Sequence, residues 1–274
     1  MPFEGDVRSP EEVLAAVRDS SPSAVIHLAA ISSVGESWQR SAETWNVNAV
    51  GTVNVIDALV AAVPRARLLF VSTGEVYGRA AETPTSESAP FAPLSPYAAS
   101  KVAAEIAAGQ AARSAGLDVV VARAFQHEGP GRGDSFAIGS WTRQIAELER
   151  RGGGELLVGD LSPERDITDV RDVCRAYELL LDPAVEGGTY NVASGAKVAL
   201  EEVVEMLVNL AQAPISVATD ESRFRPSDIP VVWGDSAKLR AATGWAPEIP
   251  LRQTLADALD YAREVVDKES VTKA

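Results

Sequence analysis

The sequence predicts an α/β protein with a doubly wound parallel sheet and a smaller C-terminal lobe. Short apolar runs alternate with segments of helical spacing, which is typical of a parallel sheet covered by helices. Residues 1–125 read as β-α-β-α-β, one half of a doubly wound sheet. After residue 130 the pattern changes to a glycine-rich loop at 129–133 and then to shorter strands between amphipathic helices.

Each element of the first half has a local signal. Ser9-Pro10-Glu11-Glu12 is a helix start, with a cap, a proline in the first turn and acids near the N-terminus. Apolar runs such as AVIHLAA predict buried strands. The expected elements are a helix from Pro10 to about Arg18, a strand at 24–30, a helix at 42–63, a strand at 67–72, an Ala-rich helix at 96–115 and a strand at 117–124.

The second half is expected to form mainly a smaller lobe. We predict helices at 138–151, from a cap at Asp169 to Leu181, at 200–211 and at 252–266, with short strands at 155–158 and 189–192. The domain hypothesis is a partial dinucleotide-binding domain at 1–130 and a lobe at 131–274. The two are interleaved, because the strand at 189–192 is expected to return to the sheet.

Composition excludes several classes of function. The chain has 274 residues, 46% of them hydrophobic, and 25 basic against 39 acidic residues give a net charge of −14. Such an acidic protein is a poor partner for nucleic acid. No run approaches the ~18 apolar residues of a membrane span. One cysteine, Cys174, excludes an internal disulfide, and no metal site is expected. We expect a cytoplasmic protein with no membrane partner.

Tyr97 and Lys101 are the first candidate catalytic pair. A Tyr-x-x-x-Lys spacing puts both side chains on one helix face, where the ammonium would lower the pKa of the phenol from ~10. Ser72-Thr73-Gly74-Glu75 ends a predicted strand, and ligands of open α/β sheets bind at such ends. Alone, the pair also fits a surface tyrosine and a snorkelling lysine.

Further motifs follow in a fixed order: HLAA (27–30), NVNAVGT (46–52), STGEVYG (72–78), SPYAASK (95–101), RAFQHEGPG (123–131) and ERDITDVRD (164–172). As a set they resemble the extended short-chain dehydrogenase/reductases that act on nucleotide sugars, whose sheet is of the Rossmann type. SSVGESW (32–38), FRPSDIP (224–230) and TGWAPEIPL (243–251) point further to the GDP-mannose 4,6-dehydratase and GDP-6-deoxy-4-keto-mannose reductase group. Gln126 stands where that group usually has asparagine.

The resemblance implies roles for individual residues. Tyr97 is the proton donor to the C4 oxygen, Lys101 tunes Tyr97 and binds the nicotinamide ribose, and Thr73 binds the same C4 oxygen. Glu75 matches the dehydratase base for the C5 proton, or is a solvated acid. The remaining implied cofactor contacts are Asp6, Val7, Leu28, Ala29, Ala30, Ser72, Arg123 and His127, and the implied substrate contacts are Ser33, Gln126, Arg165, Arg225 and Asp228.

Some implied sites have plainer alternatives. Asn48 matches a helix asparagine that is usually structural, and His127 equally fits a packed, hydrogen-bonded histidine. Arg165, Arg225 and Asp228 also fit surface ion pairs, although arginines suit a diphosphate in an acidic protein. Three acids of the ERDITDVRD motif, Asp166, Asp169 and Asp172, are expected to be caps and loop hydrogen-bond acceptors.

NAD(P) is the cofactor implied, and a GDP-sugar is the favoured substrate. No G-x-x-G-x-x-G occurs near the start, so the chain is expected to begin partway into the sheet, with weak cofactor binding and an unpaired edge at 24–30. The leading function is C4-ketone reduction of a GDP-4-keto-6-deoxy-sugar. The alternatives are a GDP-mannose 4,6-dehydratase or epimerase, and a non-catalytic remnant that binds a nucleotide sugar or a partner. A homodimer through helices 42–63 and 97–115 is expected.

Overall fold

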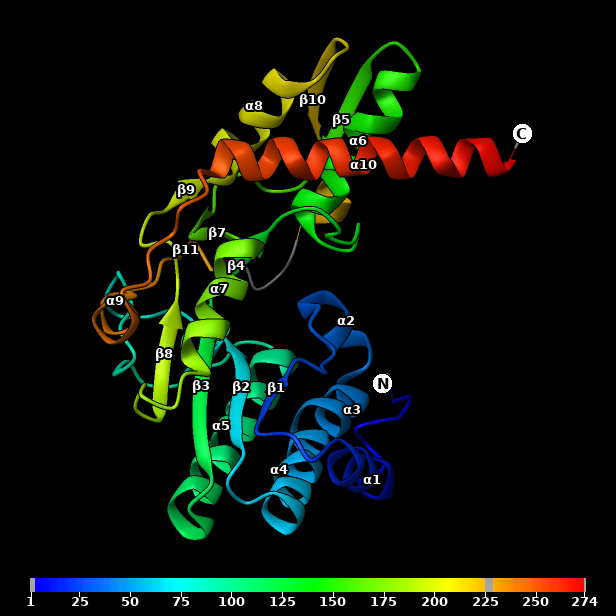
Figure 1. The fold of residues 1–274 in the computed structure, drawn as a ribbon. Coiled ribbons are helices and arrows are strands. Elements are labelled where there is room, and N and C mark those ends of the chain that lie inside the picture. The colour runs from blue at the N-terminus through cyan, green and yellow to red at the C-terminus, as the bar shows by residue number, and fades with distance from the viewer. Residues whose placement is uncertain (1–2, 225–228, 274) are drawn as a thin grey trace. The chain divides into compact units, whose positions relative to one another are not determined.

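The computed structural model describes residues 3–224 and 229–273, and the chain divides into two compact units (Figure 1). Unit 1 comprises Met1–Phe125, Arg175–Val192 and Gly234–Trp245. Unit 2 comprises Gln126–Cys174, Ala193–Trp233 and Ala246–Ala274. No helix in the described ranges is long and apolar enough to cross a membrane.

Unit 1 is built on a four-stranded parallel sheet in the order β1-β2-β3-β8. Leu68 and Phe70 of the second strand point into one hydrophobic core, whereas Leu69 between them is equally buried on the other face. Burial on both faces is what helices on both sides of a parallel sheet require, and it confirms the doubly wound α/β class. The strands are β1 (Ala24–His27), β2 (Arg67–Thr73), β3 (Asp118–Ala124) and β8 (Gly188–Val192).

The helices of unit 1 begin where the sequence places caps. Ser9 accepts a hydrogen bond from the amide of Glu12, and Ser95 accepts one from the amide of Ala98. Gly116, with φ of 68°, ends the Ala-rich helix in the left-handed conformation. The helices are α1 (Pro10–Ser20), α2 (Val34–Gln39), α3 (Ser41–Trp45), η1 (Asn46–Val50), α4 (Gly51–Ala62), η2 (Gly74–Tyr77), α5 (Pro96–Ala115) and α9 (Ala237–Thr243).

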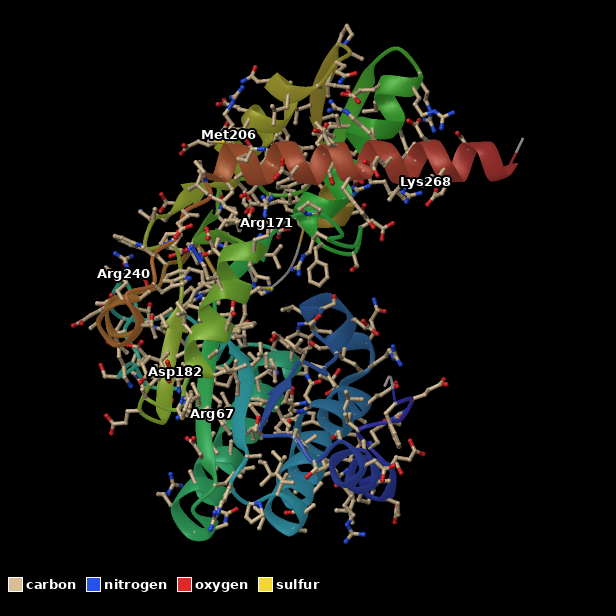
Figure 2. The ribbon with its side chains drawn as sticks, viewed as in Figure 1. Arg67, Arg171, Asp182, Met206, Arg240 and Lys268 are labelled. Carbon is tan, nitrogen blue, oxygen red and sulfur yellow. The ribbon has the colours of Figure 1, made fainter. Side chains whose placement is uncertain are left out.

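Arg67 ties the start of β2 to its neighbours (Figure 2). Its guanidinium pairs with Asp118 at 2.7 Å. It also donates to the carbonyls of Leu180, Asp182 and Val185, at 3.0, 2.6 and 2.8 Å. All of these contacts satisfy the donors of a buried guanidinium. They join the starts of β2 and β3 to the segment before β8.

Two predicted elements of unit 1 differ from the structure. The strand expected to be buried over 24–30 ends at His27, and Ile26 and Leu28 are 38% and 63% exposed. Within the described residues β1 is hydrogen-bonded to β2 alone, so the unpaired edge expected at 24–30 is confirmed and the expectation of a buried strand was wrong. The helix predicted at 42–63 is interrupted by a π-helical turn at Asn46–Val50.

Unit 2 packs three small sheets against helices around a core that includes Ile138, Trp141, Leu156 and Leu207. Its helices are α6 (Ala137–Arg150), α8 (Leu200–Leu210), η3 (Glu221–Arg223) and α10 (Leu251–Lys273), and α7 (Val170–Leu180) begins in it. Its strands are β4 (Gln126–Glu128), β5 (Gly154–Val158), β6 (Glu164–Arg165), β7 (Ile167–Asp169), β9 (Val198–Ala199), β10 (Ile215–Thr219) and β11 (Val231–Val232). α10 begins one residue before and ends seven residues after the helix predicted at 252–266.

Candidate functional site

Helix α5 of unit 1 presents the Tyr97 and Lys101 pair. The two residues are 9% and 4% exposed. A surface tyrosine and a snorkelling lysine would both be largely solvated, so that alternative is wrong. Pro96 at the first position and Ser95 as cap fix the start of the helix one residue before Tyr97.

The environment of Lys101 is apolar on one side. Its ammonium lies 4.5 Å from the ring centre of Phe70, over the face of the ring. Burial lowers the pKa of Lys101 to about 8, and the negative charge of Glu105 acts in the opposite direction. The amine is therefore still mostly charged at neutral pH.

The carboxyl end of β2 carries Ser72, Thr73 and Glu75. The hydroxyl of Thr73 accepts a hydrogen bond from the amide of Glu75 at 3.2 Å, which starts the short helix η2. Gly74 is packed so closely that an added Cβ would lie 3.0 Å from the ring of Phe125. Ser72 is turned inward and donates to Glu105. Thus Thr73 is buried at the strand end, and Glu75 is partly exposed.

Asn48 sits in the π-helical turn and acts as a clamp. Its side chain accepts from the amide of Ile31 at 2.8 Å and donates to the carbonyl of Ile31 and the hydroxyl of Ser100, at 3.0 and 2.9 Å. Ser100 in turn donates to the carbonyl of Tyr97. These contacts agree with the structural role predicted for Asn48, and they attach the loop after β1 to the helix that carries Tyr97.

The loop after β1, which Asn48 clamps, contains Leu28, Ala29 and Ala30, three of the implied cofactor contacts. Leu28 and Ala29 are exposed and Ala30 is partly exposed. Ser33 caps α2 by accepting from the amide of Glu36 at 3.3 Å. The carbonyl of Val7 accepts from the side chain of Asn54 at 2.9 Å.

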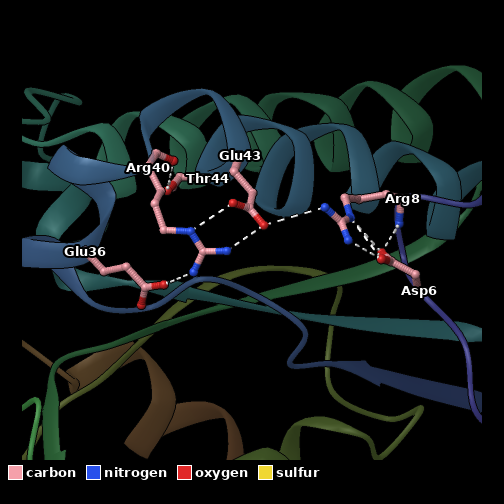
Figure 3. A network of polar contacts seen from close by, with 6 residues as sticks. All are labelled: Asp6, Arg8, Glu36, Arg40, Glu43 and Thr44. Carbon is pink, nitrogen blue, oxygen red and sulfur yellow. Dashed lines mark hydrogen bonds and ion pairs between the residues drawn. The ribbon is translucent and has the colours of Figure 1, made fainter.

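Asp6 belongs to a chain of surface charges (Figure 3). Its carboxylate accepts from the guanidinium and the amide of Arg8, and these hydrogen bonds lower the pKa of Asp6 to about 2. Arg8 approaches Glu43 at 3.6 Å, and Arg40 joins Glu43 to Glu36. The carboxylate of Asp6, an implied cofactor contact, is thus held by Arg8 in this structure.

Arg123 is fully engaged inside unit 1. It donates to both carboxylate oxygens of Glu105, to the hydroxyl of Tyr77 at 2.8 Å and to the carbonyl of Glu87 at 3.2 Å. The hydroxyl of Tyr77 in turn donates to the side-chain oxygen of Asn191 at 2.7 Å. Sequence reasoning missed Glu105, although its position four residues after Lys101 on the same helix face is a signal that could have found it.

Unit 2 carries the other predicted contacts. Gln126 donates to the buried Glu128 at 3.1 Å, and His127 lies in register with Thr168 of the neighbouring strand. Arg165 donates to the carbonyls of Glu164 and Ile229, at 2.9 and 2.8 Å. The predicted contacts Arg225 and Asp228 lie outside the described residues.

Acids in the ERDITDVRD motif are hydrogen-bond acceptors, as predicted. Asp166 accepts from the amides of Ser194 and Gly195, at 2.7 and 3.1 Å. Asp172 accepts from the amides of Glu248 and Ile249, both at 2.9 Å. Asp169 accepts from the amide of Arg171 at 2.8 Å, at the start of α7.

The donor set of unit 1 fits the nicotinamide end of NAD(P). An ammonium and a phenol on one helix face, at the carboxyl end of a parallel strand, are suitable partners for ribose and amide oxygens. Residues 28–33, the described segment that follows β1, contain no glycine and so lack the composition of a pyrophosphate turn.

Comparisons with known proteins agree on one family. The family model described as GDP-mannose 4,6 dehydratase matches residues 2–258. A GDP-6-deoxy-D-mannose reductase of Pseudomonas aeruginosa is 41% identical over 85% of this chain and 78% of its own. A GDP-mannose 4,6-dehydratase of Sinorhizobium fredii is 28% identical over 94% of this chain and 81% of its own.

Solved structures give the same result. The structure of RMD from Pseudomonas aeruginosa complexed with NADPH has a TM-score of 0.90 and 38% identity, over 97% of this chain and 90% of that one. The family model covers most of the chain, and the similarity extends to a solved fold. The chain therefore belongs to the GDP-mannose 4,6-dehydratase family of NAD(P)-dependent short-chain dehydrogenase/reductases.

Proposed function

We propose that this chain is a GDP-4-keto-6-deoxy-mannose reductase that reduces the C4 ketone of its substrate. The observation that carries the proposal is the buried Tyr97 and Lys101 pair on α5, together with Thr73 at the end of β2. Similarity to the Pseudomonas aeruginosa reductase supports the same substrate class.

Reduction requires a hydride for C4 and a proton for the ketone oxygen. A bound NAD(P)H supplies the hydride. Tyr97 donates the proton, so that C=O becomes CH–OH. Thr73 orients the oxygen by a hydrogen bond, and the ammonium of Lys101 stabilises the tyrosinate left after the transfer.

A product assay tests the proposal. Purified protein is mixed with NADPH or NADH and with freshly prepared GDP-4-keto-6-deoxy-mannose. We expect net loss of reduced cofactor together with a GDP-6-deoxy-hexose product, and loss of both in Tyr97→Phe. Tyr261→Phe, on the exposed face of α10, is the matched control. Full turnover by Tyr97→Phe would contradict the assignment of the acid.

The second candidate is a GDP-mannose 4,6-dehydratase. Glu75 favours it, because this acid is partly exposed two residues after Thr73 and so is able to reach a substrate bound at the strand end. In that reaction Glu75 takes the C5 proton and water leaves C6. GDP-mannose would then be consumed without net change in the cofactor, and a nucleotide-sugar epimerase would likewise show no net redox.

Cofactor and substrate contacts are part of the proposal. Binding of NADPH and NADH is measured by fluorescence titration of the folded protein. Binding in the micromolar range or tighter would remove the alternative of a non-catalytic remnant. No binding by a folded protein would contradict the reductase.

We propose that Arg165 and Arg225 hold the diphosphate and that Ser33, Gln126 and Asp228 contact the sugar or nucleoside. Arg165→Met should then raise KM more than it lowers kcat.

The same proposal includes a cytoplasmic homodimer. Val50, Val53 and Ile106 are 50%, 38% and 58% exposed, and they lie on or next to the helices that we expect at the dimer interface. Light scattering after gel filtration tests this: Ile106→Glu should convert a dimer to a monomer.

We also propose that residues 1–130 supply most of the cofactor site and that residues 131–274 supply most of the substrate contacts.

A further inference from the structure

Glu105 is a buried acid on the face of α5 that carries the catalytic pair. Tyr97, Lys101 and Glu105 follow one another at intervals of four residues, so their side chains lie along one stripe of the helix. Glu105 is 7% exposed. It accepts from the hydroxyl of Ser72 of β2 and from the guanidinium of Arg123 of β3, and Nη2 of Arg123 lies 2.7 Å from its carboxylate.

The position of Glu105 places a negative charge between two buried cations. Arg123 is paired with it directly, at side-chain exposures of 6% and 5%. Lys101, which is 4% exposed, lies one turn earlier on the helix and faces the ring of Phe70. Without the carboxylate, the charge of Arg123 would be left unpaired inside the protein, and Lys101 would lose the negative charge that favours its ammonium form.

Charged and titratable groups surround this stripe from each neighbouring element. β1 contributes His27, whose pKa burial and the charge of Lys101 lower to about 4, so His27 is neutral at pH 7. η2 contributes Tyr77, whose pKa burial raises to about 12, so it is also neutral. The segment before α5 contributes Glu87, through a carbonyl on Arg123 and a carboxylate on the amide of Asn191. Of these groups, Glu105 is the one whose charge raises the pKa of Lys101, against the effect of burial.

We propose that Glu105 is a positioning residue that keeps the ammonium of Lys101 charged and fixed beside Tyr97, although Glu105 itself contacts no reactant. The inference deepens the proposed reductase function and rests on it for its kinetic part. Its structural part concerns the folded protein without substrate or cofactor.

The consequence for catalysis is a defined pH range. Reduction needs Tyr97 protonated and Lys101 charged, so the rate falls when the lysine loses its proton. The present pKa of about 8 leaves little margin above neutral pH. Removing Glu105 leaves burial to act on Lys101 without the opposing negative charge, so the pKa of Lys101 falls.

The experiment compares Glu105→Gln with the unchanged protein in two ways. The pKa of Lys101 is measured by NMR of ¹³C-labelled lysine in the folded, cofactor-free protein. The chain has five lysines, and Lys101→Met assigns the signal. We expect the pKa of Lys101 and the basic limb of the kcat profile to move to lower pH by about one unit. Glu105→Asp should restore much of both.

A purely structural role would lower stability without moving either midpoint. Unchanged Lys101 titration in folded Glu105→Gln would overturn the proposal. If Glu105→Gln does not fold, Glu105→Gln/Arg123→Met removes both partners of the ion pair and is titrated instead. We expect Lys101 to titrate below its original midpoint there too, and an unchanged midpoint would overturn the proposal. Because NMR needs no turnover, a shifted lysine in a protein that does not reduce the ketone would contradict the proposed function alone.

Discussion

The guanidinium of Arg123 donates through Nε to both carboxylate oxygens of Glu105, each at 3.1 Å, and through Nη2 to Oε2 at 2.7 Å. Breaking such a buried pair leaves an uncompensated charge. We expect Arg123→Met to lower the free energy of unfolding by about 3–5 kcal/mol. Urea denaturation followed by circular dichroism measures the change.

An exposed ion pair provides the control for Arg123→Met. Arg8 and Asp6 have side-chain exposures of 48% and 43%, and solvent screens their attraction. Arg8→Met should therefore leave the unfolding midpoint nearly unchanged. Equal effects of the two substitutions would contradict the view that burial makes the Arg123 pair strong.

Because His27 is buried, we expect the free energy of unfolding to fall in acid. The hydroxyl of Thr52 donates to the carbonyl of Asn48 and therefore accepts from Nε2 of His27 at 3.0 Å. Burial, with the charge of Lys101, lowers the pKa of His27 from 6.5 to about 4. Between these values the unfolded chain binds more protons than the folded one, so stability falls as pH drops from 6.5 to 4.

The size of this effect is up to about 3 kcal/mol, from 1.36 kcal/mol for each unit of pKa. Unfolding in urea at pH 7 and pH 4.5 measures the loss. His27→Gln, which retains a donor for Thr52, should lose less stability on acidification than the unchanged protein. Proton NMR gives a second check, since the chain has two histidines and His27 should stay neutral until about pH 4.

The buried charge of Lys101 is expected to lower the stability of the fold while it serves the reaction. Its pKa falls from 10.5 in the unfolded chain to about 8 in the fold, mainly through burial, so below pH 8 the folded state holds a charge that its surroundings disfavour. We expect Lys101→Met to raise the free energy of unfolding at pH 7 by about 1–3 kcal/mol while it abolishes reduction. A loss of stability in the urea titration would contradict this balance.

Local signals made much of this architecture predictable. Ser95, Pro96 and Gly116 mark both ends of α5, and the helix runs from Pro96 to Ala115 as expected. The i,i+4 spacing of Tyr97 and Lys101 placed the pair on one face. Alternation of apolar runs and helices gave the sheet, because helices that cover both faces leave every central strand apolar.

Other features depend on contacts far apart in the sequence. The network of Glu105, Arg123 and Tyr77 joins a helix, a strand and a short turn, and no local pattern shows which buried charges meet. Strands of two or three residues in unit 2 have too few residues for a period to appear. The π-helical turn at Asn46–Val50 contains Asn48, whose side chain bonds to Ile31, a contact 17 residues away that no helix pattern shows.

The side-chain amide of Asn48 is expected to hold the loop at Ile31 in place. Asn48→Ala would leave the partly buried N–H and C=O of Ile31 without their present partner, and the loss of each hydrogen bond costs about 0.5–1.5 kcal/mol. We expect lower stability, faster hydrogen exchange at the amide of Ile31 and a reduced kcat, because Ser100 and the start of α5 lose the same anchor. Asn54→Ala removes one hydrogen bond, to the carbonyl of Val7, and is the control for losing a helix asparagine. Unchanged exchange at Ile31 in Asn48→Ala would show that the loop after β1 is held by other contacts.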